Sequence, residues 1–179
     1  LILKMNIQRT PFVKSLNHAM KAVSNRTTIP ILTGIKLTAT TDAVVLTGSD
    51  ANVSIESRIP LEEDGENGVV EQPGSIVLQG TFFADLVKKL PEDTLEISVD
   101  ERFTATIHSG STRFHLNGLD PEEYPELPNI DGGRSFRLRT DLLRDVIRQT
   151  VFAASASESQ PVLTGTNWEI RDRMLTCVA

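Results

Sequence analysis

The chain is poor in the residues on which disulfide-rich, metal-binding and membrane proteins depend. Its 179 residues include one cysteine, Cys177, so no internal disulfide can form and a reducing compartment is expected. No apolar run approaches the roughly 18 residues of a membrane-spanning helix, so no membrane partner is expected. The three histidines, His18, His108 and His115, lack the spacing of metal ligands. The sequence therefore predicts a cytoplasmic protein without a metal centre or cofactor.

Catalytic signatures are equally scarce. No phosphate-binding loop of the Walker type is present, and the glycines are isolated turn formers. Carboxylates are abundant, but they crowd two loops, at residues 62–71 and 120–131, where solvated charge is more typical than acid–base chemistry. We therefore expect no catalytic site, and an enzyme is the least favoured functional class.

What the chain does contain is an internal repeat. Residues 30–34 (PILTG) return as residues 161–165 (PVLTG), 131 positions later. Residues 10–14 resemble 140–144 at an offset of 130, and residues 46–47 resemble 175–176 at an offset of 129. Three landmarks in the same order predict a duplicated domain. The first copy is expected over residues 1–128, and residues 129–179 are expected to form the start of an incomplete second copy.

Hydrophobic periodicity changes along each copy. Helical spacing predicts helices over residues 11–24, 81–90 and 140–151, with Thr10, Thr81 and Thr140 as N-caps. An acidic loop is expected at 60–73 and a proline-rich linker at 119–133. Two-residue alternation predicts strands over 3–8, 31–40, 44–48, 53–59, 75–79, 95–99, 103–108, 112–116, 136–139, 160–170 and 174–178. This order predicts an α+β fold, with two helices packed on an antiparallel sheet in each domain.

Positive charge gathers on the predicted helices, although the formal net charge is −6. Lys14 and Lys21 lie opposite the apolar side of the first helix, and Arg144 and Arg148 lie one turn apart on the third. At an offset of 130, Lys14 matches Arg144 and His18 matches Arg148. This pattern favours a repeated surface that binds a polyanion through charge without reading bases. The alternative is an ordinary solubilising helix face.

Several motifs resemble the bacterial sliding-clamp family, the beta subunits of DNA polymerase III, and most of all its Bacillus-type members. They are residues 26–34 (RTTIPILTG), 46–50 (LTGSD), 89–91 (KLP), 116–120 (LNGLD) followed by Tyr124-Pro125, and 148–152 (RQTVF). The likeness covers residues 3–179. It implies the DNA-clamp fold, with three domains in each protomer, of which this chain would hold the N-terminal portion.

The resemblance also implies a function. The family's members are processivity factors without catalytic activity, which assemble head to tail as homodimeric rings around double-stranded DNA of any sequence. A full-length clamp tethers the DNA polymerase III alpha subunit, is loaded by a clamp loader and binds other proteins with a clamp-binding motif. The alternative is a truncated clamp paralogue that acts as a regulatory or interaction module by capping intact clamps.

Some site residues follow from matching positions. The resemblance implies DNA contacts at Arg26 and near Ser157, in addition to the basic helix faces. It implies that Leu163 is one wall of the pocket for partner peptides. Phe114 and Leu116 would belong to the dimer interface. One departure is Gln160, which stands where the family usually has an arginine.

Overall fold

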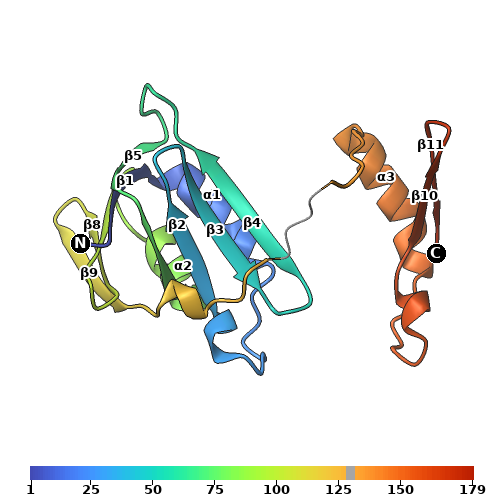
Figure 1. Ribbon diagram of the computed structural model, residues 1–179, viewed down its shortest axis with the longest axis horizontal. Helices are drawn as coiled ribbons and strands as arrows, with labels where there is room; N and C mark the ends of the chain where they lie inside the picture. Colours follow the sequence, from blue (N-terminus) through green and yellow to red (C-terminus); the bar gives the residue numbers. More distant parts are fainter. Residues whose placement is uncertain (128–131) are drawn as a thin grey trace. The chain divides into compact units, whose positions relative to one another are not determined.

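The computed structural model describes residues 1–127 and 132–179 of the chain (Figure 1). Its backbone divides into two compact units, Leu1–Pro128 and Asn129–Ala179. Pro128 and Asp131, which were expected to belong to the proline-rich linker, lie outside the described residues.

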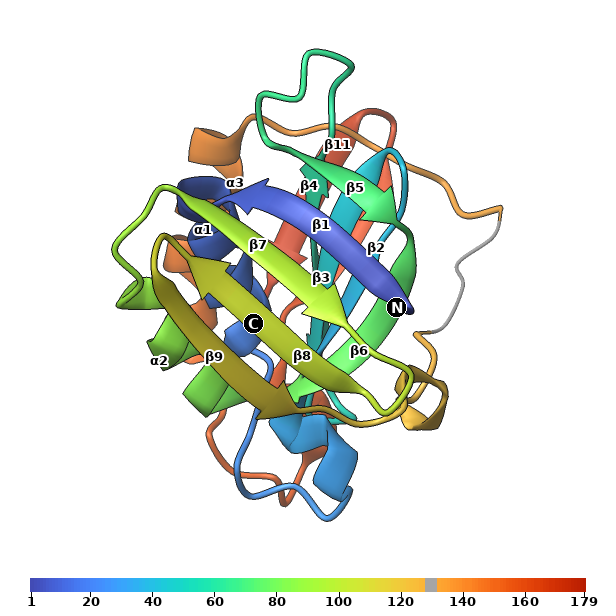
Figure 2. The same ribbon diagram turned by 90° about the vertical axis from the view of Figure 1, so that its left-hand side faces the viewer.

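Two antiparallel sheets and two helices make up the first unit. The five-stranded sheet has the strand order β5-β1-β7-β8-β9, and Figure 2 shows these strands side by side. The four-stranded sheet has the order β4-β3-β2-β6. The elements are β1 (Leu3–Gln8), α1 (Arg9–Met20), β2 (Gly34–Ala39), β3 (Ala43–Ser49), β4 (Ser54–Pro60), β5 (Gly68–Gln72), β6 (Gly74–Gln79), α2 (Gly80–Lys88), β7 (Thr94–Val99), β8 (Thr104–Ser109) and β9 (Thr112–Asn117). The α+β class is confirmed, but the strands form two sheets instead of one.

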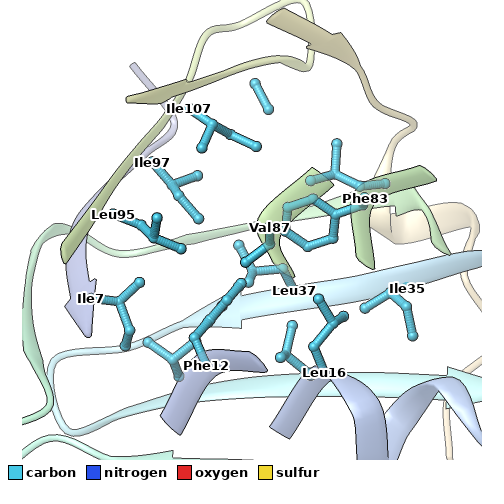
Figure 3. Packing of buried hydrophobic residues seen from close by; sticks show 14 of the residues in the cluster. Ile7, Phe12, Leu16, Ile35, Leu37, Phe83, Val87, Leu95, Ile97 and Ile107 are labelled. Atoms are coloured by element: carbon cyan, nitrogen blue, oxygen red, sulfur yellow. The ribbon is translucent and has the colours of Figure 1, made fainter. Parts of the chain in front are cut away.

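The core lies between the two sheets and the two helices and takes buried side chains from all of them. Period-two alternation buries Leu3, Met5 and Ile7 of β1 completely. The rings of Phe12 in α1 and Phe83 in α2 meet edge to face, with centroids 5.9 Å apart (Figure 3). Each such fully buried apolar side chain contributes roughly 1.5–3 kcal/mol to folding. The two helices are therefore held to each other and to both sheets by one continuous apolar cluster.

Both helices begin directly at the end of a strand. The N-cap of α1 is Gln8, the last residue of β1, and the N-cap of α2 is Gln79, the last residue of β6. The Gln79 side-chain oxygen accepts a 2.7 Å hydrogen bond from the backbone N–H of Phe82. The prediction of Thr10 and Thr81 as caps was wrong because the strand-to-helix junction leaves no room for a separate capping residue.

One predicted loop and one predicted strand also differ from the structure. β5 lies inside the stretch predicted as an acidic loop, where Asn6 of β1 pairs with Val69 at the sheet edge. A 3-10 turn, Pro30–Thr33, replaces the first three residues of the strand predicted over 31–40. Proline suits the first position of such a turn, and the N–H of Leu32 donates to the carbonyl of Ile29 instead of to a neighbouring strand, so the strand begins only at Gly34.

The start of the predicted linker is folded onto the first unit. Asp120 caps a 3-10 turn, Pro121–Glu123, by accepting a 2.9 Å hydrogen bond from the N–H of Glu122. Tyr124 follows and is almost fully buried, against a cluster formed by Ile31, Leu32 and Val77. The prolines thus end regular structure but do not prevent packing, because one aromatic side chain anchors this stretch.

The second unit contains α3 (Thr140–Thr150), a 3-10 turn at Pro161–Thr164, and a hairpin of β10 (Asn167–Arg171) and β11 (Met174–Val178). Thr140 is the first helical residue, not the cap. The strand expected at 136–139 does not form, since no described strand pairs with it. The strand expected from residue 160 begins at Asn167, because Pro161 again starts a turn.

The two units repeat at a constant offset of 131 residues. Thr140 at the start of α3 follows Arg9 at the start of α1 by 131 positions. The least exposed residues of α3, Leu143, Val146 and Thr150, follow the buried Phe12, Ser15 and Ala19 by the same number. The hairpins agree, since Leu37 pairs with Leu46 and Trp168 pairs with Cys177. The offsets of 130 and 129 inferred from sequence were therefore wrong.

Candidate nucleic-acid interface

The exposed side of α1 carries positive charge. Lys14 and Lys21 are exposed there, whereas Phe12, Leu16 and Ala19 on the opposite side are fully buried. His18, also exposed, lies between the two lysines in the last turn of the helix. Neither lysine forms an ion pair with any residue that the structure describes, so both charges are available to a ligand.

Arg26 lies in the loop that follows this helix. The Ser24 hydroxyl accepts a 3.2 Å hydrogen bond from the backbone N–H of Arg26, which fixes the turn and leaves the arginine side chain exposed. The second unit repeats this arrangement 131 positions later. There the Ser155 hydroxyl accepts a 3.0 Å hydrogen bond from the N–H of Ser157. Arg26 and Ser157 therefore occupy the same position of the same loop.

Sequence reasoning missed the two serines that build these turns. The available signal was a serine two positions before Arg26 that recurs two positions before Ser157. A hydroxyl that accepts from the backbone N–H two residues later is a common way to close a turn. Ser24 and Ser155 thus position the residues at which a polyanion contact was predicted.

On α3, Arg144 and Arg148 are both exposed, but only one of the two forms an ion pair. Arg148 forms an ion pair of 2.8 Å with Asp145, while Arg144 pairs with none of the described residues. With the offset of 131, Lys14 corresponds to Asp145 and His18 to Gln149. The predicted match of Lys14 with Arg144 and of His18 with Arg148 is therefore wrong. α3 presents a mixed surface with one unpaired arginine.

Phe114 and Leu116 lie on β9, which is the edge strand of the five-stranded sheet. Both are half-buried and pack against the core of the first unit. A groove of about 540 Å³ runs beside them, lined by Phe114 of β9 and by Phe82, Leu86 and Leu90 from α2 and its end. An edge strand has unpaired backbone groups, so this side combines apolar surface with open hydrogen-bonding positions.

Leu163 lies in the 3-10 turn of the second unit and is 53% exposed. Its backbone carbonyl accepts a 2.7 Å hydrogen bond from the N–H of Ser155, so the turn is tied to the start of the Ser155–Ser157 loop. The neighbouring Val162 is even more exposed. The turn therefore presents two apolar side chains at the surface.

Other polar groups serve local structure. The Nδ1 atom of His115 lies 3.1 Å from the Thr106 hydroxyl on the neighbouring strand. Glu62, Asp64 and Glu66 form an exposed acidic cluster in the β4–β5 connection. Among the described helices, none is long and apolar enough to cross a membrane.

Two antiparallel sheets, a helix with an exposed basic side and a repeated loop are features of a DNA-clamp type of protein. The N-terminal domain of the DNA polymerase III beta subunit matches residues 3–128, and the central domain of that subunit matches residues 137–179. The chain belongs to the DNA polymerase III beta subunit family.

Named relatives agree with this assignment. The chain is 59% identical to a beta sliding clamp of Halalkalibacterium halodurans over 97% of its length, and 53% identical to that of Bacillus subtilis over 99%. It spans about half of these relatives, 46% and 47% respectively. The crystal structure of the B. subtilis DNA polymerase sliding clamp is similar with a TM-score of 0.95, covering 99% of this chain and 47% of that one. The beta subunit of Streptococcus pyogenes is 34% identical, with a TM-score of 0.87 over 94% of this chain and 44% of that one.

Proposed function

We propose that this chain is part of a DNA sliding clamp, a processivity factor that encircles duplex DNA and tethers the replicative polymerase. The observation that carries the proposal is its membership of the beta subunit family over both units. The unpaired cations of α1 and its following loop support it, because phosphate binding needs positive charge that no carboxylate neutralises. In this function the protein catalyses no reaction and works in the cytoplasm.

The DNA-facing residues in this proposal are Lys14, Lys21 and Arg26 of the first unit and Arg144, Arg148 and Ser157 of the second. All six side chains are exposed, and the Arg148 charge is shared with Asp145. Contacts of this kind go to phosphates, so binding should be independent of sequence and should weaken steeply with salt.

Two further surfaces would connect the clamp to proteins. Phe114 and Leu116, beside the apolar groove on the β9 edge, would form the homodimer interface. Leu163 would form one wall of the pocket for peptides from the polymerase alpha subunit, the clamp loader and other partners. Its exposure supports this role, since an apolar side chain contributes to binding only when a ligand can cover it.

Retention on circular DNA tests the proposal. The full-length product of the gene should remain bound to a nicked plasmid after loading and should leave once the plasmid is linearised. Simultaneous Lys14→Glu, Arg26→Glu and Arg144→Glu substitutions should reduce DNA loading but leave peptide docking unchanged. A matched control reverses three exposed arginines outside the helices, Arg102, Arg137 and Arg173, and should keep retention.

The same measurement distinguishes the encircling clamp from the alternative function, a truncated paralogue that caps intact clamps. A product that binds an intact clamp through Phe114 and Leu116, but is not retained on circles, would establish the regulatory module. Equal retention on circular and linear DNA would contradict the encircling clamp.

A further inference from the structure

A cleft of about 300 Å³ lies between α1 and β4, the edge strand of the four-stranded sheet. Lys14 and His18 line it from the helix, one turn apart, and Ser57 and Arg58 line it from the strand. Pro11, Pro60 and Ile59 add apolar surface, and Asn67 contributes an amide. Every polar group in this lining is neutral or positive, and none is a carboxylate.

Several polar groups of the cleft already make hydrogen bonds. The Ser15 hydroxyl donates to the carbonyl of Ser57 at 3.1 Å, and the Asn67 amide donates to the carbonyl of Pro60 at 2.9 Å. A guanidinium nitrogen of Arg58 is held 2.8 Å from a carboxylate oxygen of Asp42. The Lys14 ammonium and the His18 ring, by contrast, have no hydrogen-bond partner among the described residues. Two neighbouring donors from one helix therefore remain open to a ligand.

We propose that this cleft binds one phosphodiester group of the duplex, with Lys14 and protonated His18 as its two donors. The inference rests on the proposed sliding-clamp function for the source of the phosphate. A phosphodiester has one negative charge and two free oxygens, which matches an ammonium and an imidazolium one helical turn apart. Because His18 donates from both ring nitrogens only when protonated, the affinity for DNA should depend on pH.

The charged groups around His18 decide the direction of this dependence. Arg9 and Lys14 share its helix, Lys21 is the C-cap of that helix, and Arg58 is the one charged residue that lines the cleft from β4. Arg9 is paired with Asp93 and does not line the cleft. The remaining charged residues on the strands and helix packed against α1 are Glu56 on β4, Lys4 on β1, and Asp85 and Lys88 on α2. None of these four lines the cleft, and Lys4 is paired with Glu71. A bound anion is thus the group that would favour protonation of His18, and binding should strengthen as pH falls.

Binding of a small diester tests the cleft itself. Dimethyl phosphate, whose charge is constant between pH 6 and 8, is titrated into the 179-residue chain while the histidine ring signals are followed by NMR. The His18 signals should shift with saturation at pH 6, and Lys14→Gln should weaken the effect at least twofold. His108 and His115 are internal controls that should not respond. Equal shifts of all three histidines, or none for His18, would overturn the proposal.

Affinity of the full-length gene product for a short linear duplex, on which encirclement cannot retain it, tests the cleft in its proposed role. The wild type should bind about two- to fivefold more tightly at pH 6 than at pH 8, the effect of one exposed ion pair. His18→Gln should remove this difference, and His115→Gln should keep it. The same pH response in wild type and His18→Gln would refute the cleft alone. A wild type that is not retained on circular DNA at either pH would refute the clamp function, and the diester titration would still decide the cleft.

Discussion

The hydroxyl of Thr33 donates a hydrogen bond of 2.8 Å to the carbonyl oxygen of Pro30, and this contact recurs 131 positions later. Thr164 donates to the carbonyl of Pro161 at 2.7 Å. In each turn the leucine before the threonine also donates its backbone N–H to the residue before the proline, at 3.0 Å in both copies. The repeated PxLTG motif is therefore a structural motif, a 3-10 turn closed by its own threonine.

Replacing Thr33 with valine tests this turn. The substitution keeps the shape but removes the donor, so the free energy of unfolding should fall by about 1 kcal/mol, the net contribution of one hydrogen bond. Urea unfolding measures the change. Thr28→Val, at an exposed position of the preceding loop, is the matched control and should change stability by less than about 0.5 kcal/mol.

Gly48 of the LTGSD motif should tolerate no side chain. A Cβ atom there would overlap the backbone carbonyl of Ala19 in α1, because β3 and the end of the helix are in direct contact. Gly48→Ala should therefore destabilise the first unit by about 3 kcal/mol. Gly165→Ala is the control, since nothing lies within 4 Å of its Cβ position. Equal thermal unfolding of the two variants would show that the helix moves away freely.

At Ala51, in the turn between β3 and β4, a glycine should raise the stability of the fold. Its φ of 77° lies in the left-handed region, which a side chain disfavours. Ala51→Gly should stabilise the fold by up to about 1 kcal/mol. Urea unfolding measures the change. A loss of stability would show that the flexibility that glycine adds to the unfolded chain outweighs the relief of backbone strain in the folded one.

Asp50 should make stability depend on pH. The backbone N–H groups of Val53 and Asn52 donate to its carboxylate and lower its pKa in the folded state. A lowered pKa means that Asp50 stabilises the fold above its unfolded value of about 3.9, and that this contribution disappears as pH falls through the lower folded value. Asp50→Asn should therefore reduce the loss of stability between pH 5 and pH 2. Parallel pH profiles of the urea midpoint for wild type and variant would contradict this.

Ser157→Arg should strengthen the binding of the full-length gene product to linear DNA. Ser157 occupies the position that Arg26 has in the first unit, and its loop is closed by the same serine hydrogen bond. One added phosphate contact should steepen the dependence of log affinity on log salt by about 0.9. Ser159→Arg in the same loop is the control with equal charge. A gain of the same size from both variants would mean that only net charge matters, not position.

Sequence alone determined the kind and order of most elements and the existence of a repeat, but it missed β5 and predicted a strand at 136–139 that does not form. Two-residue and helical periodicities record which side chains are buried, and burial is a local property of each strand or helix. The resemblance of short motifs also identified the family, which the matches over both units confirm.

Tertiary structure decided the features that depend on contacts between segments distant in the sequence. The register of the repeat became clear from the least exposed side of α3 and the hairpin partners, because a one-residue shift changes which side chains lie on that side. The edge strand β5, the need for glycine at Gly48 and the pairing of Lys4 with Glu71 all arise from contacts with other segments. A sequence pattern cannot specify which of several charges is neutralised, since that depends on distances that only the folded chain sets.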